Sequence, residues 1–161
     1  MIPGKQIVRG AFVVALGLFL GTPVDAADII VKNAWMRPVR AGASAAGVYV
    51  DIVTNVPLKL VGAKSRVAKS AAIVVVEQKS DGTSVDKVVK EFALAGGQET
   101  RFAYNANRID LYDITETLTP GASITVTLLF EEGPEMRQSV DIDVLVRGVI
   151  LPPAEPETKS N

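Results

Sequence analysis

Apolar and polar residues alternate along most of the chain from residue 28 onward, which is the period of a strand with one buried face. The alternation is clearest in residues 123–130 and 139–146, where every second residue is Ile, Val, Leu or Phe. Turn-forming sequences such as SDG, AGG, TPGA and EEGPE separate the runs. The pattern predicts about eight strands, at residues 28–35, 47–55, 71–79, 84–94, 96–105, 108–114, 123–130 and 139–146.

Short strands separated by turns are typical of an all-β fold, here a single antiparallel β-sandwich or barrel. No longer stretch has a helical period, although residues 66–72 could form one helical turn. Internal repeats are absent from the sequence. We therefore expect one β domain over residues 27–151, followed by a disordered tail at residues 152–161, which is rich in Pro and charge.

Residues 1–26 have the pattern of a cleaved secretory signal peptide. Lys5 and Arg9 precede an apolar run at residues 10–21, and small residues end at Ala26, before the expected cleavage site. The run is shorter than the ~20 residues of a membrane-spanning helix, so a membrane anchor is the weaker alternative. No cysteine follows it to carry a lipid. We expect a periplasmic protein that is not inserted in the membrane after signal cleavage.

The sequence contains neither histidine nor cysteine. It therefore lacks the two commonest transition-metal ligands, the usual general base and the thiol nucleophile. Ser44 has no histidine to activate it and lies in no Gly-x-Ser-x-Gly turn. A formal net charge of −1 without a basic run argues against nucleic acid as a partner. These absences predict a protein that is not an enzyme.

Three segments, in this order, resemble the periplasmic copper chaperones of the PCu(A)C family. They are VKNAWMRPVRAGASAAGVYVDIVTN at residues 31–55, SRVAKSAAIVVVEQ at 65–78 and TETLTPGASITVTLLFEEG at 115–133. Their order and spacing carry the resemblance, which covers nearly all of the expected domain. It implies a cupredoxin-like β-sandwich and a link to copper handling.

The resemblance also assigns positions to the family's copper ligands, which are a His, a later Met and a His-x-Met pair. The first His falls on Val76, the first Met within residues 85–88, and the pair on Arg108 and Asp110. Cu(I) selects imidazole, thioether and thiolate, which none of these residues supplies. Arg108 would also place a permanent positive charge where the cation should sit. We expect no cofactor and no Cu(I) site of the family type.

Arg108 and Asp110 are nevertheless candidates for a ligand surface. Two residues apart on a strand, their side chains point to the same face, which we expect to be exposed, and Tyr112 follows on that face. They could recognise a carboxylate or phosphate. The alternative is an exposed ion pair, typically worth about 0–1 kcal/mol.

Trp35, Met36 and Arg37 are the second candidate surface, because Trp and Arg are over-represented at interface hot spots. In the alternative interpretation Trp35 plugs one end of the sandwich, Arg37 closes over it and Met36 points to the other side.

The sequence therefore predicts a non-enzymatic exported domain that binds another exported or membrane-attached protein, or a small ligand, without the family's copper site. The alternative is an accessory factor in periplasmic copper handling or oxidase copper-centre assembly that docks a metal-bearing partner. Copper would be involved only in that second case.

Overall fold

The structure is a computed structural model that describes residues 27–133 and 136–148. All elements in this part are strands, which confirms the predicted all-β fold. The predicted signal peptide, residues 1–26, and the predicted tail, residues 152–161, lie outside the described residues. The ten strands are β1 (Ile29–Met36), β2 (Ala45–Thr54), β3 (Leu58–Ser65), β4 (Ala68–Gln78), β5 (Ser84–Val89), β6 (Phe92–Leu94), β7 (Glu99–Phe102), β8 (Arg108–Ile114), β9 (Ser123–Glu132) and β10 (Met136–Val146).

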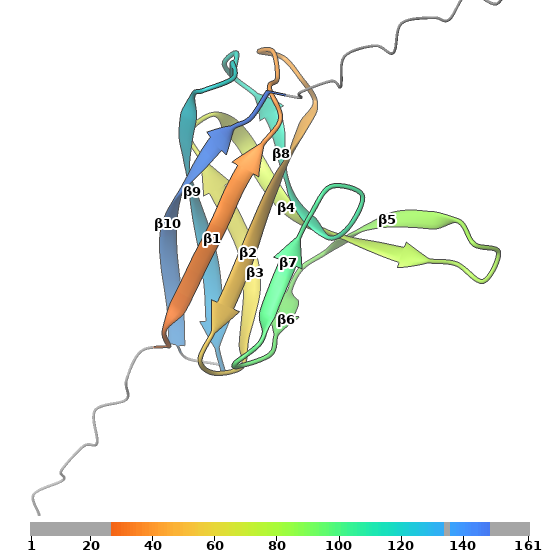
Figure 1. Ribbon diagram of the computed structural model, residues 1–161, viewed down its shortest axis with the longest axis vertical. Coiled ribbons are helices and arrows are strands. Elements are labelled where there is room, and N and C mark those ends of the chain that lie inside the picture. The colour runs from red at the N-terminus through yellow and green to blue at the C-terminus, as the bar shows by residue number, and fades with distance from the viewer. Residues whose placement is uncertain (1–26, 134–135, 149–161) are drawn as a thin grey trace, which may run out of the picture.

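The strands form one sheet in the order β5-β4-β8-β2-β1-β10-β9-β3-β6, with β7 also paired to β2. Neighbouring strands are antiparallel except β1 and β10, which run parallel. β5 and β6 lie at opposite ends of this order, yet only Lys90 and Glu91 separate them in sequence. The sheet therefore has to curl until its two edges approach each other at this connection, and Figure 1 shows the rolled sheet.

The inward faces of the strands supply the core. The largest side chains that are less than 2% exposed are Phe102, Phe130, Met36, Ile52, Leu60, Ile73, Ile109, Leu111, Ile114, Leu128, Val48 and Val50. Burial of each such side chain contributes about 1.5–3 kcal/mol relative to leaving it exposed. In β9 and β10 the buried residues alternate as the sequence predicts.

Three local predictions are wrong. The sequence pattern did not predict β3, because a bulge between Leu60 and Gly62 breaks the alternation. Before the bulge Leu58 and Leu60 point into the core, and after it Ala63 does. Residues 84–94 form two strands instead of one, since β5 pairs with β4 and β6 pairs with β3. Residues 66–72 form no helical turn, because β4 already begins at Ala68.

A second bulge, in β1, orders a polar network. The register with β2 shifts between Lys32 and Trp35, and Asn33 adopts a positive φ of 52°. Its Nδ2 donates to Oδ2 of the buried Asp51 at 2.8 Å, and Arg101 Nε, from β7, donates to Oδ1 at 3.0 Å. The Asn33 hydrogen bond is the main reason why the pKa of Asp51 lies below its ordinary value.

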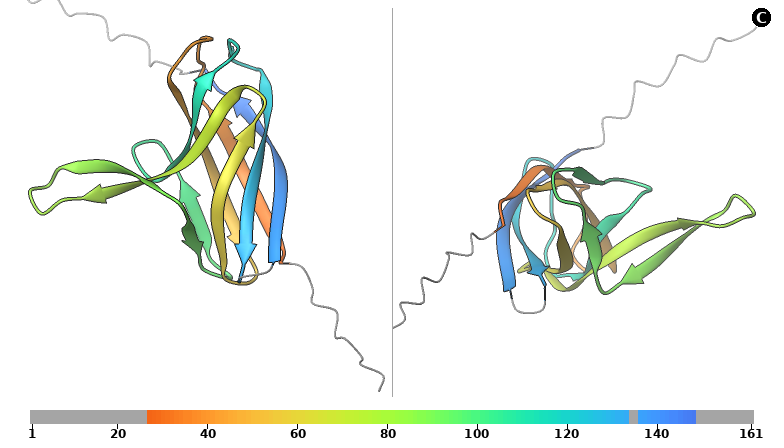
Figure 2. Two further views of the ribbon diagram at one scale, coloured as in Figure 1. Left: turned by 180° about the vertical axis from the view of Figure 1, so that it is seen from behind. Right: turned by 90° about the horizontal axis from the view of Figure 1, so that it is seen from below.

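The β4–β5 hairpin projects from the barrel as an arm, which Figure 1 shows from the front and Figure 2 from behind and below. β8 pairs with β4 only as far as Val74, whereas β4 continues to Gln78 with β5 as its partner. Beyond Val74 the arm is thus two-stranded, and an isolated hairpin is only marginally stable in water. Contacts at its base therefore matter for its position.

Candidate functional site

Arg108 joins the arm to the barrel. Its Nε donates to both carboxylate oxygens of Asp110, to Oδ1 at 2.9 Å and to Oδ2 at 3.2 Å. Its terminal nitrogens donate to both oxygens of Asp86 on β5, with Nη1 at 3.3 Å from Oδ1. The pairing of β4 with both β8 and β5 explains why Arg108 and Asp86 lie close together. On β4, Val74 lies opposite Arg108, and Val76, two residues later, lies opposite Asp86.

The expectation that Arg108 and Asp110 form an exposed pair is wrong. Their side chains are only 19% and 10% exposed, whereas Asp86 is 56% exposed. β8 lies inside the sheet between β4 and β2, so neighbours cover both flanks of the pair. The hydrogen bond to Asp86 is the main reason why the pKa of Arg108 lies above its ordinary value, and Arg108 lowers the pKa of Asp86.

The positions that the resemblance assigns to copper ligands lie together in space. Val76, Asp86 and Arg108 line one hollow of about 370 Å³, and Asp110 is hydrogen-bonded to Arg108 at its edge. Tyr49 and three further residues complete the lining, namely Ser84, Tyr104 and Asn105. No cluster of three or more His, Cys, Asp or Glu with metal-binding geometry occurs in residues 27–133 and 136–148.

An aromatic row runs beside this hollow. Trp35 of β1 lies opposite Tyr49 of β2, with ring centroids 4.5 Å apart, and Tyr49 packs edge-on against Tyr104 at 6.1 Å. A Cβ on Gly47 would lie 2.9 Å from the hydroxyl oxygen of Tyr49, so the glycine makes room for that ring. Burial raises the pKa of Tyr49 above its ordinary value.

Two guanidinium groups lie over rings of the aromatic row. Arg37 lies over the Tyr104 ring at 4.6 Å from its centroid, and Arg147 lies 5.6 Å from the centroid of Trp35. The backbone N–H of Arg147 donates to Met36 O at 2.9 Å, which brings the end of β10 beside β1. Trp35, Arg37, Tyr104, Arg147 and Gly148 line a second hollow of about 290 Å³, named here the arginine–aromatic hollow.

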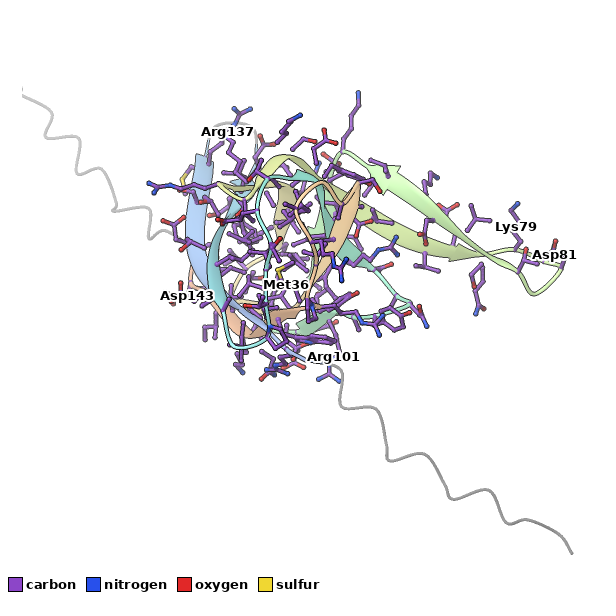
Figure 3. The ribbon with its side chains drawn as sticks, turned by 90° about the horizontal axis from the view of Figure 1, so that it is seen from above. Met36, Lys79, Asp81, Arg101, Arg137 and Asp143 are labelled. Carbon is purple, nitrogen blue, oxygen red and sulfur yellow. The ribbon has the colours of Figure 1, made fainter. Side chains whose placement is uncertain are left out.

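The second candidate surface is therefore only partly as predicted. Trp35 is half-buried and Arg37 is exposed, but Arg37 covers Tyr104, and it is Arg147 that covers Trp35. Met36 is completely buried and belongs to the core, where Figure 3 labels it inside the barrel. Strand alternation is the reason, because Trp35 and Met36 point to opposite faces of β1. Met36 is thus excluded from any partner surface.

Tyr112 lies half-buried on the same face of β8 as Arg108 and Asp110. Burial raises its pKa, and the nearby Asp110 carboxylate adds to the effect. Sequence reasoning did not single out Tyr49 or Arg147 as site residues. Their only signal is the cross-strand register, which places them beside Trp35 and cannot be read from a single strand.

In the part of the chain that the structure describes, no helix has the length and apolar character needed to cross a membrane.

Solved structures with similar folds include PCuAC domains, one of them copper-bound. The copper-bound PCuAC domain from PmoF2 has a TM-score of 0.59 and 22% identity, covering 74% of this chain and 92% of that domain. The apo PCuAC domain from PmoF1 gives 0.58 and 24%, with coverage of 74% and 93%. Apo-DR1885 from Deinococcus radiodurans gives 0.54 and 17%, with coverage of 93% and 95%. These similarities confirm the predicted cupredoxin-like β fold.

No protein with a curated description matches the sequence significantly. A family model does match, over residues 29–142, and its description is "Putative lipoprotein LpqE-like". The match covers most of the chain and nearly all of the strands. The chain therefore belongs to the LpqE-like family, with the fold of PCuAC domains.

Proposed function

We propose that this chain is an exported, non-enzymatic binding module whose copper-site positions no longer hold copper. The observation that carries the proposal is the meeting of Val76, Asp86, Arg108 and Asp110 at one hollow. The resemblance to copper chaperones assigns Val76, Arg108 and Asp110 to metal ligands and a fourth ligand to residues 85–88, where Asp86 lies. In this chain an arginine that is hydrogen-bonded to two carboxylates occupies the hollow.

The chemistry of these residues disfavours Cu(I). A soft cation needs sulfur or imidazole ligands, and the hollow offers carboxylates, a guanidinium and an aliphatic side chain. Both carboxylates are already hydrogen-bonded to Arg108. A cation would have to displace a buried guanidinium of the same charge, which leaves Arg108 without its partners.

The same network supports a role in binding. It fastens β5 of the arm to β8 of the barrel, so the hollow and the aromatic row beside it have a preformed shape. Preorganised sites lose less free energy on binding because fewer groups become ordered at that moment. Tyr104 is 53% exposed and Arg37 is exposed, and both residue types are common at interface hot spots.

The absence of histidine and cysteine from the sequence supports a non-enzymatic function. Export to the periplasm is supported by the signal-like pattern of residues 1–26 and by the lipoprotein description of the family, although the sequence has no cysteine for a lipid.

A Cu(I) titration in competition with a colorimetric chelator tests the proposal, with the copper-binding PmoF2 domain as positive control. We expect this protein to show no site tighter than about micromolar. A stoichiometric nanomolar site would overturn the proposal. An accessory factor that docks a metal-bearing partner would give the same titration, but its binding to that partner would depend on the partner's copper.

A further inference from the structure

We infer that the arginine–aromatic hollow binds a carboxylate of an acidic protein segment. The inference rests on the proposed function, since it names the partner chemistry of a binding module. It concerns a different set of groups from the Arg108 network, although Tyr104 lines both hollows.

The two arginines of this hollow have unused hydrogen-bonding capacity. The Cζ atom of Arg37 lies over the Tyr104 ring, and that of Arg147 lies over the Trp35 ring. A cation–π contact uses the positive charge of the guanidinium and no hydrogen-bond acceptor, so N–H groups that do not face the ring stay available as donors. Among the described residues neither arginine has a salt bridge or a side-chain hydrogen bond. Planar forks of this kind recognise carboxylates with two parallel hydrogen bonds.

The local charge is positive and uncompensated. In residues 27–133 and 136–148, the side chains that line the arginine–aromatic hollow include two arginines and no acidic group. The neighbouring hollow differs, because there Asp86 and Asp110 neutralise Arg108. An acidic group would therefore be attracted to the arginine–aromatic hollow and not to the hollow lined by Arg108. This difference would orient a segment bound across both hollows.

The aromatic side chains favour a protein segment over a free anion. A small anion would contact the guanidinium groups alone and would not cover the Tyr104 ring, which is 53% exposed although Arg37 lies over it. Residues on either side of an acidic side chain would cover that ring, and the shared Tyr104 extends the surface towards the arm. The positions are well defined, because Trp35 lies in a paired strand and the Arg147 backbone is hydrogen-bonded to Met36.

Trp35 provides the readout, since it is the single tryptophan of the sequence. The probe is an acetylated and amidated peptide of alternating glutamate and proline, titrated into the full-length protein while tryptophan emission is followed. We expect saturable binding that R37Q/R147Q weakens by about tenfold or more, which is the loss of one charge-assisted hydrogen bond. R137Q removes one positive charge at the other end of β10, and it should alter the affinity by less than about twofold because roughly 33 Å of strand, about three Debye lengths, separates Arg137 from Arg147.

Three further measurements test the same site with a neutral peptide, a Tyr104 variant and lipid vesicles. The matching glutamine peptide should not bind, and Tyr104→Ala should weaken binding without removing charge. Equal binding of the glutamine peptide, unchanged affinity of R37Q/R147Q with native circular dichroism, or no binding of the acidic peptide would each overturn the inference. Binding to phosphatidylglycerol vesicles without peptide binding would overturn it in favour of a membrane surface. If neither copper nor peptide binds, only this inference fails and the metal-free site remains.

Discussion

Arg108 and Asp110 form a largely buried ion pair within β8, with Nε 2.9 Å from Oδ1, and the same guanidinium reaches Asp86 on the projecting arm. One side chain thus neutralises a buried carboxylate and fastens a hairpin that has a single strand partner beyond Val74. Loss of one partner from a buried pair costs more free energy than loss of both, because the remaining charge is left without compensation.

Arg108→Met should therefore lower the free energy of unfolding by about 2–3 kcal/mol, somewhat less than for a fully buried pair, because Arg108 keeps some exposure to water. Urea denaturation of the purified protein at neutral pH measures the change. The double variant R108M/D110L removes both charges and should recover most of the loss. A single variant as stable as the wild type would show that the pair contributes nothing.

Asp86→Asn should loosen the arm and leave the barrel intact. Its carboxylate is the group of β5 that contacts Arg108, so its neutralisation weakens the attachment of the arm. We expect amide hydrogen exchange in residues 84–89 to become about fivefold faster, while the core strands keep their protection.

Lys87→Gln is the matched control for the arm. Lys87 lies next to Asp86 but on the opposite face of β5, where it forms an exposed pair with Glu77 at 2.9 Å. Exposed ion pairs contribute little to stability, so amide hydrogen exchange in residues 84–89 of Lys87→Gln should equal that of the wild type. Equal effects of both variants would contradict a specific role for the contact between Arg108 and Asp86.

Asn33→Gly should make the stability of the protein less dependent on acid pH. Glycine accepts the positive φ of residue 33 but removes the hydrogen bond to Asp51, which is worth about 1.5–3 kcal/mol for an ionised acceptor. Because the folded pKa of Asp51 is lowered, its contribution is complete above the ordinary value of 3.8 and is lost as pH falls through the folded pKa.

Thermal unfolding of the wild type and of Asn33→Gly at pH 7 and at pH 3 tests this expectation. The difference in melting temperature between the wild type and Asn33→Gly should be larger at pH 7 than at pH 3. Asn105→Gly, at a comparable φ of 59°, controls for the backbone effect and should change stability equally at both pH values. A difference for Asn33→Gly that is independent of pH would rule out Asp51 as its cause.

Restoring the ligands should restore a copper site if the assigned positions are correct. The variant V76H/D86M/R108H/D110M places two imidazoles and two thioethers around the hollow, and we expect a stoichiometric Cu(I) site tighter than about micromolar. Competition with a colorimetric chelator measures the affinity.

The control for this variant keeps Asp86 and places the first methionine at Lys87, on the opposite face of β5. It should bind Cu(I) more weakly, since one of the thioethers points away from the hollow. A folded revertant without a copper site would count against the assigned positions.

The alternation of residues was sufficient to predict β8 and β9 nearly to their ends, because a strand with one buried face needs an apolar side chain at every second position. The same rule failed at β3, where the bulge after Leu60 shifts by one residue the positions that point into the core. It also failed between β5 and β6, since the change of pairing partner at Lys90 and Glu91 leaves no mark in the local pattern.

The sequence by itself determined the fold class and the available chemistry. Its alternation predicts strands, it contains no imidazole or thiol, and it has an arginine and an aspartate at the positions assigned to a His-x-Met pair. Only the tertiary structure decided that this pair is largely buried, that Asp86 completes it, that Met36 belongs to the core and that Arg147 covers Trp35. The physical reason is that residue type and strand period are local properties. Burial and charge pairing depend on sheet order and register, which join residues far apart in the chain.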